Sequence, residues 1–282
     1  MNNKKCGYLL FICGVCLYSL SDAIMKYFMS FYGVNQIVFW RTIFRFFPFL
    51  FLIFYTRTNP LKTDRPRENI LRAFLASGGT YAFMYAYKYS AMTDVFVIGL
   101  TTAIFVIPLS VWILKEKFYR QNVFVIFLGF FGICLAMRPG SGELNPGILF
   151  ALVGAVISAL NQVIVKKLSA TENELTIISY HNILLILISS LGGMTAFAPA
   201  APEHIAFLFV GGVVGAVAQY LIIHSFKLSS SSGLASAGYV MLIPNTLFDF
   251  FLYNKIPDVY IIAGLLLIMI GTFRAFTLQS KM

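Results

Sequence analysis

The chain contains the stretch GYLLFICGVCLYSLSDAIMKYF at Gly7–Phe28 and a second, related stretch, GILFALVGAVISALNQVIVKKL, at Gly147–Leu168. The two align without a gap at a spacing of 140 residues, and six positions are identical: Gly7/Gly147, Leu9/Leu149, Gly14/Gly154, Leu20/Leu160, Ile24/Ile164 and Lys26/Lys166. Apolar composition explains the paired Leu and Ile residues, but it does not explain the paired glycines and lysines. The pattern therefore predicts a duplication, with a first copy over 1–140 and a second over 141–282.

The composition is that of a membrane protein. Hydrophobic residues make up 59% of the 282 residues and charged residues only 11%, against about 45–50% and about 25% in soluble domains. A helix that crosses a bilayer needs about 20 mostly apolar residues. Ten apolar runs, separated by Gly, Pro, Asn and charged residues, meet this need: 7–30, 35–55, 68–89, 93–114, 120–137, 146–168, 174–195, 204–227, 231–253 and 258–277.

Further matches at a spacing of 139 residues extend the duplication: Tyr87-Lys88 with Phe226-Lys227, Gly99 with Gly238, and Gly132 with Gly271. Each copy then holds five helices. Because five is odd, the second copy enters the membrane in the opposite sense to the first, as in many secondary transporters. We expect an all-α integral membrane protein with ten transmembrane helices, arranged as two inverted five-helix repeats.

The net charge of +10 follows membrane topology and does not indicate a partner nucleic acid, because the basic residues cluster between the apolar runs. With the N-terminus inside, fifteen basic residues are cytoplasmic: Lys4, Lys5, Arg57, Lys62, Arg65, Arg67, Arg72, Lys115, Lys117, Arg120, Lys166, Lys167, Lys227, Arg274 and Lys281. Three are external: Lys88, Arg138 and Lys255. This bias predicts that both termini are cytoplasmic.

Several segments resemble the drug/metabolite transporter superfamily, EamA branch. They are the Lys26 and Lys166 ends of the first and sixth helices, the Arg45-Phe46 pair, and Leu114–Lys117 (LKEK). Three more are similar to S-adenosylmethionine uptake transporters of intracellular bacteria: Asp22–Tyr27 (DAIMKY), Phe39–Phe46 (FWRTIFRF) and Leu61–Pro66 (LKTDRP) with Arg72 after it. The resemblance implies a central cavity surrounded by helices 1–4 and 6–9, with helices 5 and 10 outside it.

Charged residues inside the predicted spans mark the candidate site, because such groups are expensive in a bilayer and usually face a cavity or a partner. Asp22 and Lys26 share one face of the first helix, and Arg41 and Arg45 share one face of the second. Asp22 can pair with either arginine. One interpretation is a helix–helix salt bridge. The other is a substrate site in which Arg45 holds a carboxylate by its planar fork and Asp22 faces a cation.

Polar and aromatic residues complete the candidate site, although each also fits helix packing. A substrate such as S-adenosylmethionine requires a carboxylate clamp, a group for its ammonium and sulfonium, and a stacking surface. The predicted substrate-binding residues are Arg45, Asp22, Arg41, Tyr81, Tyr85, Trp40, Trp112, Asn161, Gln162, Gln219 and Tyr239.

These features predict a secondary transporter of a small metabolite in the cytoplasmic (inner) membrane. The preferred substrate is S-adenosylmethionine, by uptake or exchange, and the substrate class is zwitterionic or cationic. An amino-acid or other small-metabolite exporter of the same superfamily is the alternative, and an intramembrane enzyme is a remote one. We expect no cofactor, metal site or catalytic residue, since the chain has no G-x-x-x-x-G-K-[ST] phosphate loop and no metal-ligand spacing around its four cysteines. A homodimer is a candidate oligomeric state.

Cysteines introduced for labelling test the predicted topology. Positions 33 and 141 should react with an impermeant thiol reagent from outside, and positions 63 and 118 only from inside, because of the charge bias. Reaction of position 63 from outside alone would contradict the topology.

Overall fold

The computed structural model describes residues 3–99, 101–116, 146–191, 197–230 and 237–254, with isolated positions at 234, between 123 and 131 and between 259 and 267. The regular structure in this part of the chain is helical. The fifth and tenth predicted spans, 120–137 and 258–277, fall outside it apart from those isolated positions. The count of ten spans therefore stays a prediction.

The described elements follow the predicted apolar runs to within a few residues at most ends. They are α1 (Asn3–Phe28), α2 (Val34–Thr56), α3 (Pro66–Tyr89), α4 (Met92–Gly99), α5 (Thr102–Leu114), α7 (Pro146–Ser169), α8 (Glu174–Leu191), α9 (Pro202–Leu228), the 3₁₀ turn η2 (Gly238–Met241) and α11 (Leu242–Tyr253). Among them α1, α2, α7, α8 and α9 are each long and apolar enough to cross a membrane.

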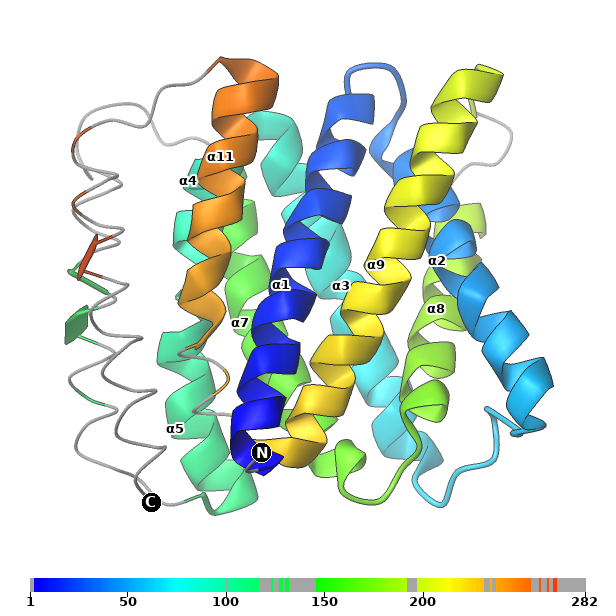
Figure 1. Ribbon diagram of the computed structural model, residues 1–282, viewed down its shortest axis with the longest axis vertical. Helices are drawn as coiled ribbons and strands as arrows, with labels where there is room; N and C mark the ends of the chain where they lie inside the picture. The colour runs from blue at the N-terminus through cyan, green and yellow to red at the C-terminus, as the bar shows by residue number, and fades with distance from the viewer. Residues whose placement is uncertain are drawn as a thin grey trace.

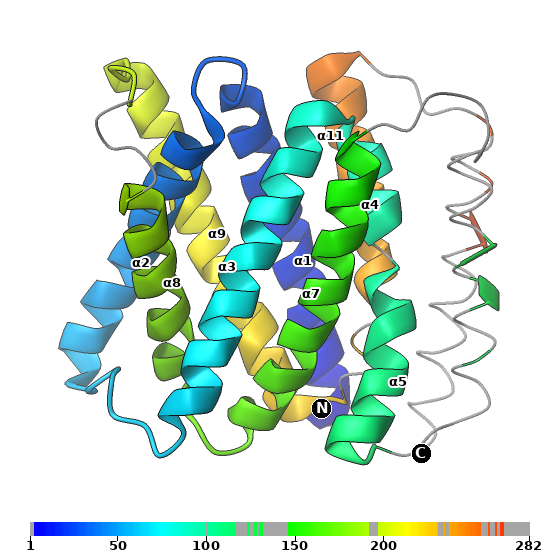
Figure 2. The same ribbon diagram turned by 180° about the vertical axis from the view of Figure 1, so that it is seen from behind.

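The helices stand side by side in two layers. Figure 1 shows α1, α9 and α11 in front, and Figure 2, from behind, shows α3, α7, α4 and α5. The helices α2 and α8 close one edge. The most extensive packing joins α1 to α9 and α3 to α7. Each half thus packs its first helix against the third helix of the other half, and the two repeats interlock.

Equivalent junctions of three helices stand at the two ends of the bundle. At the upper end in Figure 1, Lys26 of α1 donates from Nζ to the Ser90 carbonyl (3.1 Å), just past the end of α3. A Cβ on Gly147, in the first turn of α7, would collide with the Ser90 side chain. The paired lysine therefore satisfies a carbonyl at a helix end, and the paired glycine lets the next helix approach it.

At the lower end the second copy repeats this arrangement. Lys166 of α7 donates to the carbonyls of Phe226 (2.6 Å) and Ser229 (2.8 Å) at the end of α9. Gly7 of α1 packs so closely that an added Cβ would collide with Ser229. The identities Lys26/Lys166 and Gly7/Gly147 are thus explained by the same contact made once at each end.

Two predicted spans are interrupted, at the paired glycines. The fourth span, expected to be continuous over 93–114, breaks after Gly99, where the Thr101 amide donates to the Ile98 carbonyl (2.9 Å) and α5 starts afresh. In the ninth, Gly238 opens the 3₁₀ turn η2 before α11. Glycine is a poor helix former, and interrupted helices are common at the binding sites of transporters.

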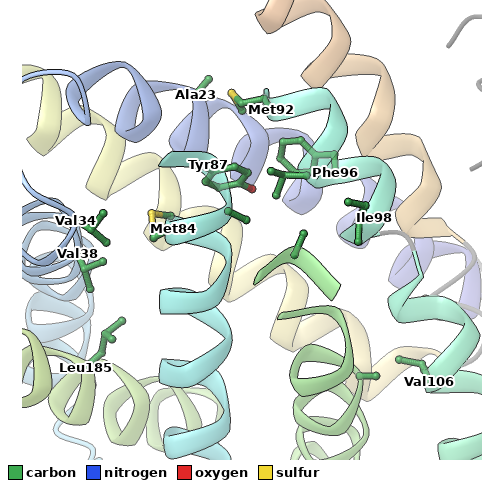
Figure 3. Close-up of a cluster of buried hydrophobic side chains, with 14 of the residues drawn as sticks. Ala23, Val34, Val38, Met84, Tyr87, Met92, Phe96, Ile98, Val106 and Leu185 are labelled. Atoms are coloured by element: carbon green, nitrogen blue, oxygen red, sulfur yellow. The ribbon is translucent and has the colours of Figure 1, made fainter. Parts of the chain in front are cut away.

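A cluster of buried apolar side chains lies where the halves meet. Figure 3 shows members from α1, α2, α3, α4, α5 and α8, with Tyr87 of α3 beside Phe96 of α4. The centroids of these two rings are 5.7 Å apart. This packing fixes α3 and α4 next to the polar groups described below.

Replacement of Lys166 tests the junctions. Lys166→Met should destabilise the protein by about 1–3 kcal/mol, because buried carbonyls at the end of α9 lose their donor. The neighbouring Lys167 is half exposed and pairs with Glu68, itself partly exposed, so Lys167→Met should have little effect. Thermal unfolding in detergent measures both. Equal losses for the two variants would contradict the assigned role of Lys166.

Candidate substrate-binding site

A cavity of about 300 Å³ lies between the two halves. Its walls come from α1, α2, α3, α4, α5, α7, α8, α9 and η2. These elements correspond to predicted spans 1–4 and 6–9, as the family resemblance implied. Most of the charged and polar side chains that line it are buried, so the cavity gathers the groups that are expensive in a membrane.

Asp22 of α1 forms an ion pair with Arg41 of α2, and both side chains are buried. The second oxygen of the Asp22 carboxylate accepts a hydrogen bond from the Tyr87 hydroxyl (3.1 Å). Of the two partners that the sequence allowed for Asp22, the structure selects Arg41. Because the carboxylate already accepts from Arg41 and Tyr87, it is a neutralised group and not a free anion in the wall.

Arg45, one turn further along α2, lines the same cavity without a carboxylate partner among the described residues. Its side chain is 1% exposed, and its Nε and Nη2 have no hydrogen-bond partner in this part of the chain. Tyr18 of α1 packs beneath it, with the guanidinium carbon 5.2 Å from the ring centroid. Tyr18 lies one turn before Asp22, which is the signal by which the sequence could have identified it.

Arg72 is a further residue of the cavity wall. It was expected among the cytoplasmic positive charges, and the structure shows it 3% exposed in the cavity wall. Its Nη1 donates to the Ile177 carbonyl of α8 (2.7 Å). Arg72 lies in the second turn of α3. Arg72 then shares a helix face with Ala76, Gly79 and Phe83, which also line the cavity.

The second half contributes neutral polar groups. Gln219 of α9 contacts His181 Nδ1 of α8 (3.2 Å) and lies 3.4 Å from the Asn182 amide nitrogen. Asn161 Oδ1 and Gln162 Oε1 of α7, which also line the cavity, have no partner among the described residues. At the spacing of 140 residues, Gln162 takes the place of Asp22 and His181 that of Arg41. The two copies therefore share the arrangement of their helices but differ in the charged side chains at equivalent positions.

The predicted aromatic residues lie elsewhere. Trp112 is 79% exposed on the outer surface. Trp40 stacks on Phe44, and Tyr85 on Phe150. Tyr81 packs against the apolar cluster of Figure 3. None of these four lines the cavity, and the Tyr239 side chain lies outside the described part of the structure.

The rings that do line the cavity are Phe11, Tyr18, Phe83, Tyr87, Phe96 and Phe226. Sequence patterns could not separate these rings from the others, since both sets sit at helical spacing in apolar segments.

Contacts at the upper end of the bundle join the two halves above the cavity. The Tyr32 hydroxyl bonds to His204 Nδ1 (2.7 Å). The Gln36 side chain donates to the Ala198 carbonyl (2.6 Å) and accepts from its amide (3.0 Å). The residues that line the cavity extend from Phe226, near the end of α9, to Tyr87 in the last turn of α3. The arrangement is a polar chamber between two halves that are joined by these contacts at the upper end, and at the lower end by the junction of Lys166 and Gly7 and by the Lys167–Glu68 ion pair (3.1 Å).

Comparison with known proteins agrees with this architecture. The chain is 26% identical to the S-adenosylmethionine uptake transporter of Rickettsia prowazekii, over 100% of this chain and 97% of the relative. It is 25% identical to a riboflavin transporter of Brucella anthropi (83% and 84% covered) and 22% identical to a pseudopaline exporter of Pseudomonas aeruginosa (95% and 94% covered). A solved crystal structure shares the fold, with a TM-score of 0.78, 15% identity and coverage of 98% and 97%.

The EamA-like transporter family matches residues 5–138 and, a second time, residues 145–277. The two matches correspond to the two copies of the repeat found in the sequence. The named relatives are transporters and not enzymes. This chain belongs to the EamA-like transporter family.

Proposed function

We propose that this small-metabolite transporter carries S-adenosylmethionine across the inner membrane, by uptake or exchange. The observation that carries the proposal is the similarity over the whole chain to a transporter of that name. The cavity supports it, because one chamber is lined by a buried guanidinium, by side-chain carbonyl oxygens that have no hydrogen-bond partner among the described residues, and by several aromatic rings.

Each part of such a substrate has a partner of suitable chemistry in the wall. Arg45 would hold the carboxylate through its planar fork. Asn161 Oδ1 and Gln162 Oε1 accept hydrogen bonds and would receive the ammonium or the amino group of the base. Phe83 and Phe96 offer faces for the base and the sulfonium. Gln219 would act through His181, which it contacts.

We assign Asp22 and Arg41 a positioning role in place of the cation contact expected from sequence. Their ion pair joins α1 to α2, and the Tyr87 hydroxyl extends it to α3. A substrate cation would have to displace Arg41 from Asp22 and leave that arginine buried without a counter-ion, which is costly.

Transport by alternating access follows from the two inverted, interlocked halves. If both termini are cytoplasmic, the upper end of the bundle faces outward, and the contacts of Tyr32 and Gln36 close the outer side. The junction of Lys166 with the end of α9 lies at the inner end. Movement of one half against the other would then open one side of the cavity while the other side stays closed.

A second candidate substrate class is favoured by the charge of the cavity. Arg41, Arg45 and Arg72 carry three positive charges and Asp22 one negative charge, which leaves two positive charges (3 − 1 = 2). This excess suits an amino acid or another carboxylate-bearing metabolite that lacks a sulfonium. Relatives named for riboflavin and pseudopaline show how broad the substrates of similar chains are.

Purified protein in proteoliposomes tests the substrate directly. Liposomes preloaded with unlabelled S-adenosylmethionine should accumulate the labelled compound, and external S-adenosylmethionine should compete better than methionine, other amino acids or riboflavin. S-Adenosylhomocysteine, which lacks the sulfonium charge, measures what that charge contributes. Exchange of amino acids without exchange of S-adenosylmethionine would contradict the proposed substrate and favour an amino acid or another carboxylate-bearing metabolite.

The ion pair of Asp22 and Arg41 is tested by a double-variant cycle. Asp22→Asn or Arg41→Gln alone should destabilise the protein by about 3–5 kcal/mol, because one buried charge loses its partner. The double variant should regain most of the stability, measured by thermal unfolding, and much of the transport. A double variant that is stable but inactive would show that one of the two groups contacts the substrate.

A further inference from the structure

We infer that Arg72 and Arg45 together form a two-armed oxyanion site in the central cavity, which binds a carboxylate or phosphate group of the transported molecule. The inference rests on the proposed function in one respect, namely that the cavity is the path of the substrate. It adds Arg72 of α3 to Arg45 of α2, which sequence patterns suggested as the single group that holds the carboxylate.

Charge balance is the first argument. Arg45 is 1% exposed and Arg72 is 3% exposed. Arg41, the third arginine of the cavity, is neutralised by Asp22, whereas neither Arg45 nor Arg72 forms an ion pair within the described residues. A buried guanidinium without a counter-charge is strongly unfavourable. Two such groups in one wall form a site whose natural complement is an anion.

The geometry of Arg45 is the second argument. Its Nε and Nη2, the edge that can bind an oxyanion with two parallel bonds, have no partner among the described residues. Gly215 of α9 lies close to these two nitrogens: a Cβ there would lie 3.1 Å from both of them. A side chain at position 215 would therefore displace the Arg45 guanidinium.

The geometry of Arg72 is the third argument. Its Nη1 is fastened to the Ile177 carbonyl of α8 (2.7 Å), and its buried Nε has no partner in this part of the chain. The planar group is thus held on one side and retains a donor on another. Arg45 of α2 and Arg72 of α3 line the same cavity.

Four ligands that share the adenosine group test whether the site binds a carboxylate or a phosphate. S-Adenosylmethionine carries a carboxylate, adenosine 5′-monophosphate carries a phosphate, and decarboxylated S-adenosylmethionine and adenosine carry neither. Titration of each into the purified full-length protein, followed by the thermal unfolding midpoint, gives an apparent affinity. We expect at least one anion-bearing ligand to bind about tenfold or more tightly than its counterpart without the anion.

Variants with matched controls assign the effect to the two arginines. Arg72→Gln and Arg45→Gln should each weaken the anion-bearing ligand by about tenfold or more, measured against the midpoint of the same variant without ligand. Arg67→Gln, an exposed position on the same helix as Arg72, should not. Gly215→Ala should weaken binding with both arginines in place, while Gly78→Ala, where a Cβ meets only Ile157 at 3.9 Å, should have no effect. If Arg72→Gln does not fold, the same binding measurement is made with Gly215→Ala and Arg72→Lys.

The outcomes separate this inference from the proposed function. Equal affinity within both pairs, S-adenosylmethionine with its decarboxylated form and adenosine 5′-monophosphate with adenosine, overturns the oxyanion site and leaves the substrate proposal intact. Binding of adenosine 5′-monophosphate that needs both arginines, without binding of S-adenosylmethionine, supports the site and overturns that substrate. If neither compound, nor inorganic phosphate, gives a shift that Arg72→Gln abolishes, the oxyanion site is overturned.

Discussion

Burial of charge in a membrane protein is the constraint on which the centre of this structure depends. A charged side chain at mid-membrane costs about 2.5–3.5 kcal/mol on insertion scales, and the described part of the chain buries Arg41, Arg45, Arg72 and Asp22 around one cavity. One arginine is neutralised by the carboxylate and by its link to Tyr87. The other two keep their charge and face the chamber. Burying two uncompensated charges costs stability, and this cost is explained if the charges bind a substrate. The cavity is therefore the candidate substrate-binding site.

The two halves contribute unequally to this cavity although their backbones repeat. The contacts of Lys26 with Ser90 and of Lys166 with the end of α9 are equivalent, and so are the close approaches of Gly147 and Gly7. These contacts fasten the halves and need the same residues at both ends. The substrate meets both halves at once, so its two sides can be recognised by different groups. The first half supplies the charges and the second supplies Asn161, Gln162 and Gln219.

The fold was largely predictable because its signals are local. Apolar runs define the helices, and the pairs Gly7/Gly147 and Lys26/Lys166 define the repeat. The breaks at Gly99 and Gly238 were not predicted, since a single glycine in an apolar run is compatible with a continuous helix. The fifth and tenth spans and the orientation of the termini remain predictions.

The site was only partly predictable because it depends on which faces of nine elements meet. The charges of Asp22, Arg41 and Arg45 identified it, since charge in a span is rare. The partner of Asp22 required the structure, because both arginines lie within reach on one face. Arg72 was counted with the cytoplasmic charges since it lies close to charged residues at the start of α3, and its place in the cavity wall required the structure. The stacking residues Trp40, Tyr81, Tyr85 and Trp112 were chosen among many aromatic residues that have the same spacing.

The central claim is that the chamber between the halves holds the transported molecule by its anionic group. A structure of the protein in lipid nanodiscs with bound S-adenosylmethionine tests it most directly. The account predicts the carboxylate within hydrogen-bond distance of Arg45 and Arg72, with the base between rings of the cavity wall and Asp22 still paired with Arg41. A ligand bound outside the chamber, or bound inside it with the carboxylate turned away from both arginines, would contradict the account.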